Sequence, residues 1–187
     1  LQGYSKTIRL LLVMFLTLTV TTNAWGATWE KATSIAAGDV VLLVSESKKM
    51  ELSGISTTST KYGTGVSYTT SPAGAYELTV EAGSSTGTYS LKNGSNYLYW
   101  SSGNSLATNA TKSANSSWSI TFNNGNATIK NAKDNARIIG WNASSPRFAC
   151  YTSSQTAVQL YKKVTAVQTV AVTGVSLNPT SLTLTVG

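Results

Sequence analysis

Few residues in this chain could carry acid–base or nucleophilic chemistry. Histidine is absent from all 187 residues, and Cys150 is the single cysteine. Without an imidazole, a serine or cysteine nucleophile lacks its usual general base, and an HExxH zinc site cannot form. Phe148 and Tyr151 are close neighbours of Cys150. We therefore expect Cys150 to be a small buried side chain rather than a reactive thiol.

The seven carboxylates are the remaining catalytic candidates, because a pair of them could hydrolyse a glycosidic bond. Glu77 and Glu81 lie on or beside an alternating strand, on the side expected to face solvent. Asp39 and Asp134 lie in turn sequences. The others are Glu30, Glu46 and Glu51. No Asp/Asn cluster resembles a calcium site, and no glycine-rich loop leads into a helix. We predict no enzyme activity, no metal site and no cofactor.

Aromatic residues beside polar loops form the one remaining functional pattern. Tyr97, Tyr99 and Trp100 precede a Ser-Ser-Gly-Asn loop, and Trp141 precedes Asn-Ala-Ser-Ser. An exposed ring can cover the C–H face of a sugar while amides and hydroxyls bind its hydroxyl groups. The predicted ligand-binding residues are Tyr97, Tyr99, Trp100, Asn104, Trp141, Asn142 and Arg147. The alternative is that these aromatic rings pack inward and close the hairpins.

Positive charge is spread along the chain. The formal net charge is +7, yet the basic residues form only short groups such as Lys48-Lys49 and Lys162-Lys163. A nucleic-acid-binding domain usually gathers its basic residues on one face or one helix. We therefore expect no specific nucleic-acid partner.

Short alternating runs separated by turn residues predict an all-β chain. Asn93-Gly94, Ser102-Gly103 and Asn124-Gly125 are such turn signals. Trp118 alternates with Ile120, which places it in the core. The expected strands are 40–44, 75–80, 88–91, 96–100, 118–122, 127–130, 136–139, 147–151 and 157–162. Many short strands at close spacing are typical of a β-barrel or a β-sandwich.

A repeat of about 40 residues runs through these strands. Leu78, Ile120 and Leu160 occupy matching positions in three closing strands. Two of the units contain an apolar-Lys-Asn turn, a short apolar strand and a Ser-rich loop, followed by one large apolar residue, Leu106 or Phe148. Repeated units of this kind bury a shared core that no single unit could form.

The pattern resembles a β-trefoil, in which three four-stranded units close six strands into a barrel capped by three hairpins. The resemblance covers residues 28–163, and in the degenerate first unit we expect the segment through Tyr62 and Val66 to be a loop. Ricin-type lectins are similar, and the resemblance implies one shallow site per unit. Their Gln-x-Trp signature is replaced here by Ser-Ser-Trp118 and Ala-Val-Gln-Leu160, so their sugar contacts are not carried over. A β-sandwich is the alternative fold.

Residues 1–27 have the pattern of a secretory signal peptide. Lys6 and Arg9 precede an apolar run at 10–20, and small and polar residues follow. The run is shorter than the ~20 residues that a transmembrane helix needs. We predict a signal helix, export to the cell surface or the medium, and membrane contact only through this segment. The alternative is a buried N-terminal helix.

The C-terminal residues have a different character from the repeated units. Residues 164–172 are apolar and uncharged, and we interpret them as a linker. Residues 173–187 resemble the opening of a bacterial immunoglobulin-like domain of the group 2 type, with Val175-Ser-Leu-Asn-Pro179 followed by Leu182, Leu184 and Gly187. The resemblance implies a truncated domain, present here as a loose strand fragment of a larger bacterial protein.

Three functions fit these patterns. The first is a non-catalytic extracellular module that binds a carbohydrate or another surface polymer within an exported multidomain protein. The second is a structural or adhesive element at the cell surface with a protein partner. The third is an accessory domain of a hydrolase whose catalytic domain lies beyond Gly187.

Overall fold

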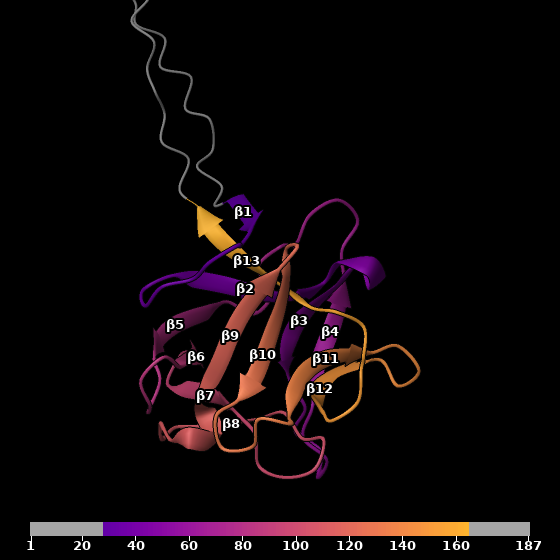
Figure 1. Ribbon diagram of the computed structural model, residues 1–187. Helices are drawn as coiled ribbons and strands as arrows, with labels where there is room; N and C mark the ends of the chain where they lie inside the picture. Colours follow the sequence, from indigo (N-terminus) through magenta and orange to yellow (C-terminus); the bar gives the residue numbers. More distant parts are fainter. Residues whose placement is uncertain (1–27, 165–187) are drawn as a thin grey trace, which may run out of the picture.

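The computed structural model describes residues 28–164, a part of the chain built from β-strands (Figure 1). Its thirteen strands are β1 (Thr28–Lys31), β2 (Val40–Ser45), β3 (Met50–Ile55), β4 (Gly63–Ser67), β5 (Leu78–Ala82), β6 (Tyr89–Asn93), β7 (Asn96–Tyr99), β8 (Ala107–Asn109), β9 (Trp118–Asn123), β10 (Asn126–Asn131), β11 (Ile138–Asn142), β12 (Arg147–Tyr151) and β13 (Gln159–Val164). Short 3-10 helices occupy Glu46–Lys48 (η1) and Ala114–Ser116 (η2). The all-β prediction is confirmed for the described residues.

Two predicted segments fall outside this part of the chain. The signal peptide (1–27) and the immunoglobulin-like start (173–187) lie outside the described residues, as does the predicted linker except for Val164, which ends β13. Within residues 28–164, no helix has the length and apolar character needed to cross a membrane.

The strands form three four-stranded units, all with antiparallel pairing. Each unit has an opening strand (β2, β6, β10), a hairpin (β3–β4, β7–β8, β11–β12) and a closing strand (β5, β9, β13). Opening and closing strands alternate in a circuit, β2–β5–β6–β9–β10–β13, which returns to β2. The β10–β13 link is a single bridge between Ala127 and Val158. Because the thirteen described strands share one hydrogen-bonded network, they do not form the two separate sheets of a β-sandwich.

A predicted tight turn joins β9 to β10. Asn124 and Gly125 have φ angles of 48° and 77°, and Asn123 pairs with Asn126 across the turn. Two successive residues with positive φ match the right-handed twist of a hairpin, and Asn-Gly is the sequence that best tolerates this conformation. The turn fixes the register in which Ile120 faces Ile129.

The nine predicted strands are present with shifted ends, but β1, β3, β4 and β8 were not predicted. The segment containing Tyr62 and Val66, expected to be a loop, includes strand β4. The sequence of β4 lacks an apolar alternation because Gly63 lies where a side chain would not fit. A Cβ at Gly63 would be 2.5 Å from Leu52 Cδ1 and 2.9 Å from Phe148 Cβ. Leu52 of the same unit and the large residues Leu106 and Phe148 of the other two units fill this space.

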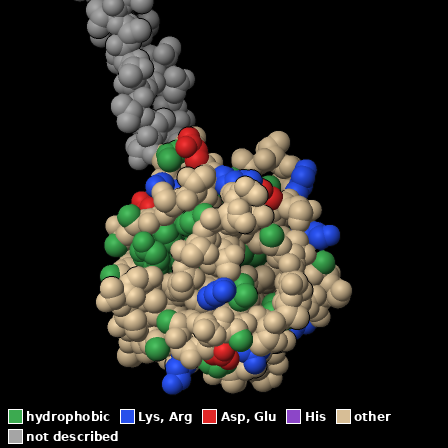
Figure 2. Space-filling view, in the orientation of Figure 1, with side chains coloured by type: hydrophobic (Ala, Val, Ile, Leu, Met, Phe, Trp, Pro, Cys, Tyr) green, Lys and Arg blue, Asp and Glu red, His purple; other side chains and the backbone are tan. Residues whose placement is uncertain are grey.

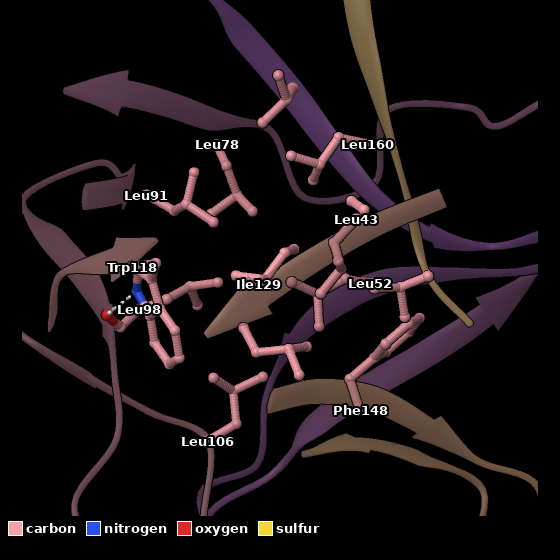
Figure 3. Close-up of a cluster of buried hydrophobic side chains, with 14 of the residues drawn as sticks. Leu43, Leu52, Leu78, Leu91, Leu98, Leu106, Trp118, Ile129, Phe148 and Leu160 are labelled. Atoms are coloured by element: carbon pink, nitrogen blue, oxygen red, sulfur yellow. Dashed lines mark hydrogen bonds between the residues drawn. The ribbon is translucent and has the colours of Figure 1, made fainter. Parts of the chain in front are cut away.

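The core lies between the three units (Figure 3). Matching positions of the opening strands (Leu43, Leu91, Ile129) are fully buried, and so are Leu78 and Leu160 of two closing strands. In the remaining closing strand the buried residue is Trp118, as predicted, and its Nε1 donates a hydrogen bond to the Leu98 carbonyl (3.3 Å). Ile120, predicted to match Leu78 and Leu160, is only partly buried and packs against this core. Strand pairing places Leu160, Val80 and Ile120 opposite the matching residues Leu43, Leu91 and Ile129. The predicted match of Ile120 with Leu160 is therefore confirmed, whereas Leu78 matches Trp118 instead, so the predicted register is wrong at β5.

Cys150 is fully buried, as predicted. It lies on β12 between the buried residues Ala149 and Tyr151. Burial raises the pKa of the Cys150 thiol well above its usual range, because the thiolate would lose its hydration. The thiol therefore stays protonated and behaves as a small apolar side chain.

Candidate functional site

One pocket gathers three of the predicted ligand-binding residues. It has a volume of about 210 Å³ and lies where the start of β4, the β7–β8 loop and the β11–β12 hairpin meet. We call it the Arg147 pocket. Its lining residues are Thr60, Lys61, Tyr62, Asn104, Asn142, Ser145, Arg147, Ala149 and Tyr151.

Backbone hydrogen bonds between the units hold the walls of this pocket together. Leu106 N donates to the Lys61 carbonyl (3.0 Å), and Cys150 N donates to the Asn104 carbonyl (3.2 Å). Phe148 pairs with Gly63 where β12 meets β4. These contacts join one residue stretch from each unit, so the pocket depends on the assembled fold rather than on one hairpin.

The guanidinium of Arg147 is fixed in position. Its Cζ lies 4.7 Å from the centroid of the Tyr62 ring. Its Nε donates to the Ser145 carbonyl (3.2 Å), and its Nη2 donates to Ser145 Oγ (2.8 Å). Among the described residues Arg147 has no carboxylate partner, and its Nη1 donates to no acceptor there. The side chain is thus an oriented cation with N–H groups that are free to donate to a ligand.

Two asparagine side chains in the pocket are also oriented. Asn142 Oδ1 accepts hydrogen bonds from Ser144 N and Ser145 N (both 3.0 Å), the pattern of an Asx turn. Asn104 Oδ1 accepts one from Arg137 Nη1 (3.0 Å). Because backbone amides and arginine can only donate, these contacts assign the oxygen and nitrogen of each amide. Each asparagine therefore has its Nδ2 group available to a ligand.

Trp100 adjoins the pocket without lining it. Its indole Nε1 donates to the Gly103 carbonyl (2.9 Å), and the side chain is half-buried. The guanidinium carbon of Arg137 lies 5.8 Å from the centroid of its ring, and Arg137 also bonds Asn104. Arg137 thus connects Trp100 to the edge of the pocket.

The structure places the two predicted tyrosines elsewhere. Tyr97 is only 9% exposed, and its hydroxyl donates to Glu81 (3.1 Å). Tyr97 and Leu98 are neighbours on β7 and yet both are buried, since the Nζ atoms of Lys92 and Lys112 lie 5.4 and 5.3 Å from the centroid of the Tyr97 ring. Tyr99 is half-buried on β7 and does not line the pocket.

The prediction that Trp141 offers an exposed ring is wrong. Trp141 is 3% exposed and packs edge-to-face on Phe148, with ring centroids 4.8 Å apart. Gly65 of β4 lies against the other side of the indole, where a Cβ would be 2.8 Å from Cζ3. The alternative interpretation, that the aromatic ring closes a hairpin, is the correct one for this residue.

Tyr62, Arg137 and Tyr151 are site residues that the sequence pattern did not identify. Tyr62 falls in the segment expected to be a loop, and Arg137 falls in the expected strand 136–139. The signal available in the sequence was an aromatic beside a basic residue, Lys61-Tyr62, in the first unit. Only the inter-unit contacts show that Tyr62 meets Arg147.

The seven carboxylates lie outside the pocket, and all except Glu30 have an ion-pair or hydrogen-bond partner among the described residues. Glu51 is 1% exposed and accepts hydrogen bonds from Ala73 N (2.8 Å) and Ala75 N (2.5 Å). Glu81 pairs with Lys112 (2.8 Å) and Lys92 (3.0 Å). Hydrogen bonds from Lys112 and then Lys92 lower the pKa of Glu81 to about 2. Within residues 28–164, no group of His, Cys, Asp and Glu is arranged to hold a metal ion.

A second hollow lies beside the same β11–β12 hairpin. It has a volume of about 420 Å³ and lies between the β9–β10 hairpin, β11 and the segment 152–158. We call it the neutral groove, because none of its lining residues is charged. They are Asn123, Asn126, Ala127, Thr128, Ile138, Ile139, Gly140, Thr152, Ser153, Ser154, Gln155, Thr156, Ala157 and Val158. Figure 2 shows the basic side chains of one face lying apart, with uncharged surface between them.

Comparisons with known structures define the fold. A GH43 β-1,3-galactosidase is similar with a TM-score of 0.54 and 14% identity, over 71% of this chain and 29% of that chain. The designed three-fold symmetric protein ThreeFoil is similar with a TM-score of 0.51 and 14% identity, over 65% of this chain and 96% of that one. SeviL, bound to the asialo-GM1 saccharide, is similar with a TM-score of 0.52 and 9% identity, over 70% and 99% of the two chains.

These likenesses show a β-trefoil-like fold. The chain spans less than a third of the length of the galactosidase and nearly all of ThreeFoil and SeviL. No model of a known protein family matches the sequence, and no curated protein matches it.

Proposed function

We propose that this chain contains a non-catalytic saccharide-binding module and that the Arg147 pocket is its site. The observation that carries the proposal is the meeting of Asn104, Asn142 and Arg147, which come from two units, in one pocket beside the Tyr62 ring. All three were expected to bind a sugar on sequence grounds. SeviL, a protein of the same fold, is bound to a saccharide, which supports the proposal.

The chemistry of the pocket suits a sugar. The two asparagine Nδ2 groups and the Arg147 guanidinium are donors, and sugar hydroxyl and ring oxygens are acceptors. The volume of about 210 Å³ is smaller than the ~300–1,000 Å³ of pockets that hold drug-sized ligands. A single sugar unit is therefore the expected occupant, and the affinity of one site would be low.

The biological setting is part of the same proposal. Export through residues 1–27 and continuation into immunoglobulin-like domains after residue 173 would place the module at the surface of a bacterial cell or in the medium. Several weak sites on one surface would then bind a polymer more tightly than one site does. We also propose that the circuit of opening and closing strands is the closed barrel of a β-trefoil.

Two other functions have some support. The burial of Trp141 against Phe148 is what a structural or adhesive element with a protein partner would show. A role as the accessory domain of a hydrolase is supported by the likeness to part of a β-1,3-galactosidase, since this chain covers 29% of that protein. The Arg147 pocket favours saccharide binding over both, because it gathers Asn104, Asn142 and Arg147, whose polar groups suit sugar hydroxyls, in one small hollow.

A glycan array probed with the full 187-residue chain tests the proposal. We expect retention on at least one glycan, and a loss of about 2- to 10-fold in Asn104→Ala, the usual effect of removing one neutral hydrogen bond. Gln155→Ala in the neutral groove is the matched control and should bind like the parent. Retention on no glycan, or equal losses in both variants, would exclude saccharide binding at this pocket.

A further inference from the structure

The polar groups available in the Arg147 pocket are mostly hydrogen-bond donors. The Oδ1 of Asn142 accepts two hydrogen bonds from the protein, which occupy both of its lone pairs, and the Oδ1 of Asn104 accepts one from Arg137. Asn142 therefore presents only its Nδ2 group, and Asn104 presents its Nδ2 group and one oxygen lone pair. The Arg147 guanidinium and the Lys61 ammonium can only donate. A ligand that fits must therefore offer several acceptor oxygens close together.

The charge of the pocket is not balanced within the described residues. Lys61 and Arg147 line it, and no carboxylate does. The comparison with Arg137 is informative, since its Nε lies 3.4 Å from an Asp134 carboxylate oxygen. The seven acidic residues all lie in the described part of the chain, and none of their ion pairs includes Lys61 or Arg147. The pocket thus favours an anion from outside.

The guanidinium is held in a plane before any ligand arrives. Tyr62 stacks on it, and Ser145 accepts from its Nε and Nη2. Ser145 uses Nε and one hydrogen of Nη2, so Nη1 and the second hydrogen of Nη2 remain free to donate side by side, which is the geometry that matches the paired oxygens of a carboxylate. A cation already held in its binding orientation loses little conformational entropy when it binds.

We infer that the occupant of the Arg147 pocket is an acidic sugar whose carboxylate accepts hydrogen bonds from Arg147, while its hydroxyl groups accept from the Nδ2 groups of Asn104 and Asn142. The inference rests on the proposed saccharide-binding function and names the class of sugar. Lys61, whose Nζ donates to the Thr57 carbonyl (3.1 Å), adds positive charge at the same rim.

The test uses acidic glycans and their carboxyl-reduced forms, in which a CH₂OH group replaces the carboxylate. The full chain is titrated with oligosaccharides ending in glucuronic, galacturonic or sialic acid, with each reduced counterpart, and with a sulfated neutral sugar. We expect reduction to weaken binding by about 10- to 100-fold, the effect of losing a charge-assisted hydrogen bond. Raising the salt concentration should weaken binding of the acidic form only.

Variants at the same position separate charge from geometry. Arg147→Gln should remove the preference for the acidic form, and Arg147→Lys should restore only part of it because lysine lacks the planar fork. An unchanged melting temperature and circular dichroism spectrum show that each variant is folded.

The outcomes distinguish the two proposals. Equal binding of acidic and reduced glycans, both lost when Asn104 is replaced, would keep the saccharide function and overturn the acidic assignment. Stronger binding of the sulfated sugar than of the carboxylated ones would overturn the carboxylate assignment. Binding of no sugar at all would overturn both.

Discussion

The Arg147 pocket and the neutral groove lie beside the same hairpin but differ in charge. Ile138, Ile139 and Gly140 of β11 line the groove, whereas Asn142 and Arg147 at the hairpin end line the pocket. The groove has about 420 Å³ and the pocket about 210 Å³. The larger hollow has neither a charged nor an aromatic side chain in its lining, and the smaller one has both.

The difference shows that volume is a poor guide to function in this molecule. In the neutral groove Asn126 Oδ1 accepts from Gln159 Nε2 (2.6 Å), and Gln159 Oε1 accepts from Glu46 N (2.9 Å). These bonds connect η1, β10 and β13, so the polar side chain of Asn126 has a role in the fold. In the Arg147 pocket the protein supplies the cation and leaves its anion to be supplied by a ligand.

The largest effect is expected at Trp141, the buried residue of β11 between the two hollows. Trp141→Ala should lower the free energy of unfolding by ~3–5 kcal/mol, because it leaves a cavity beside Phe148 and Gly65. Urea unfolding measures this. Trp100→Ala is the control and should cost much less, since Trp100 is only half-buried. A stable Trp141→Ala protein that has lost glycan binding would show that the indole, despite its burial, contacts the ligand.

The next largest effect reverses the charge of the pocket. Arg147→Glu should weaken binding of a uronic-acid glycan by about 100-fold or more, because repulsion is added to the loss of charge-assisted hydrogen bonds. Gln155→Glu places the same charge in the neutral groove and should leave binding nearly unchanged. Isothermal titration calorimetry compares the two variants. Equal losses would mean that the two hollows act together and that the contrast between them is wrong.

The fold could be predicted further than the site. Alternating apolar residues and Asn-Gly turns act over a few residues, so the strands and the three-unit repeat were visible in the sequence. Strand β4 was missed because Gly63 is set by the volume of Leu52 and Phe148 from other strands. The contact between Tyr62 and Arg147 joins residues from different units, and no local pattern reports it. The repeated polar loops singled out Asn104, Asn142 and Arg147, which line one pocket, and their role as ligand contacts stays a prediction. Trp141 was expected to be exposed, but it is buried, because the local sequence pattern does not show which residues pack over a ring.

A smaller effect is expected at the Tyr62 ring, which the neutral groove lacks. Cation–π contacts are worth ~0.5–2 kcal/mol, so Tyr62→Leu should weaken binding of acidic glycans by roughly 2- to 30-fold through loss of the fixed Arg147 orientation. Tyr62→Phe keeps the ring and should bind within about 2-fold of the parent, on the same cation–π grounds. If Tyr62→Phe lost as much affinity as Tyr62→Leu, the hydroxyl rather than the ring face would be the important group.

The smallest effect concerns the stability of the fold in acid. This stability sets the lowest pH at which sugar binding to the Arg147 pocket can be measured. An acidic sugar should leave the Arg147 pocket as its own carboxyl group is protonated, because arginine stays charged at every accessible pH. That measurement needs a folded protein at low pH. Glu81 affects how the stability of the fold changes at low pH, because Lys112 and Lys92 lower the pKa of its carboxylate from 4.5 to about 2.

The direction in which the Glu81 ion pairs change stability with pH follows from the direction of that pKa shift. Since the pKa of Glu81 is lower in the folded chain than in the unfolded one, its ion pairs stabilise the fold fully above pH 4.5, and this contribution is lost as the pH falls from 4.5 to about 2. Glu81→Gln should lower the melting temperature slightly at pH 7, and the melting temperature of this variant should fall less steeply below pH 4.5. Both changes should be small because solvent screens the Glu81 carboxylate. Glu77→Gln, which breaks a pair with Lys163 alone, is the control. If the melting temperature of Glu81→Gln equalled that of the parent at pH 7 and fell as steeply below pH 4.5, groups other than Glu81 would govern acid stability. Circular dichroism at each pH would then be needed to separate loss of glycan binding from unfolding.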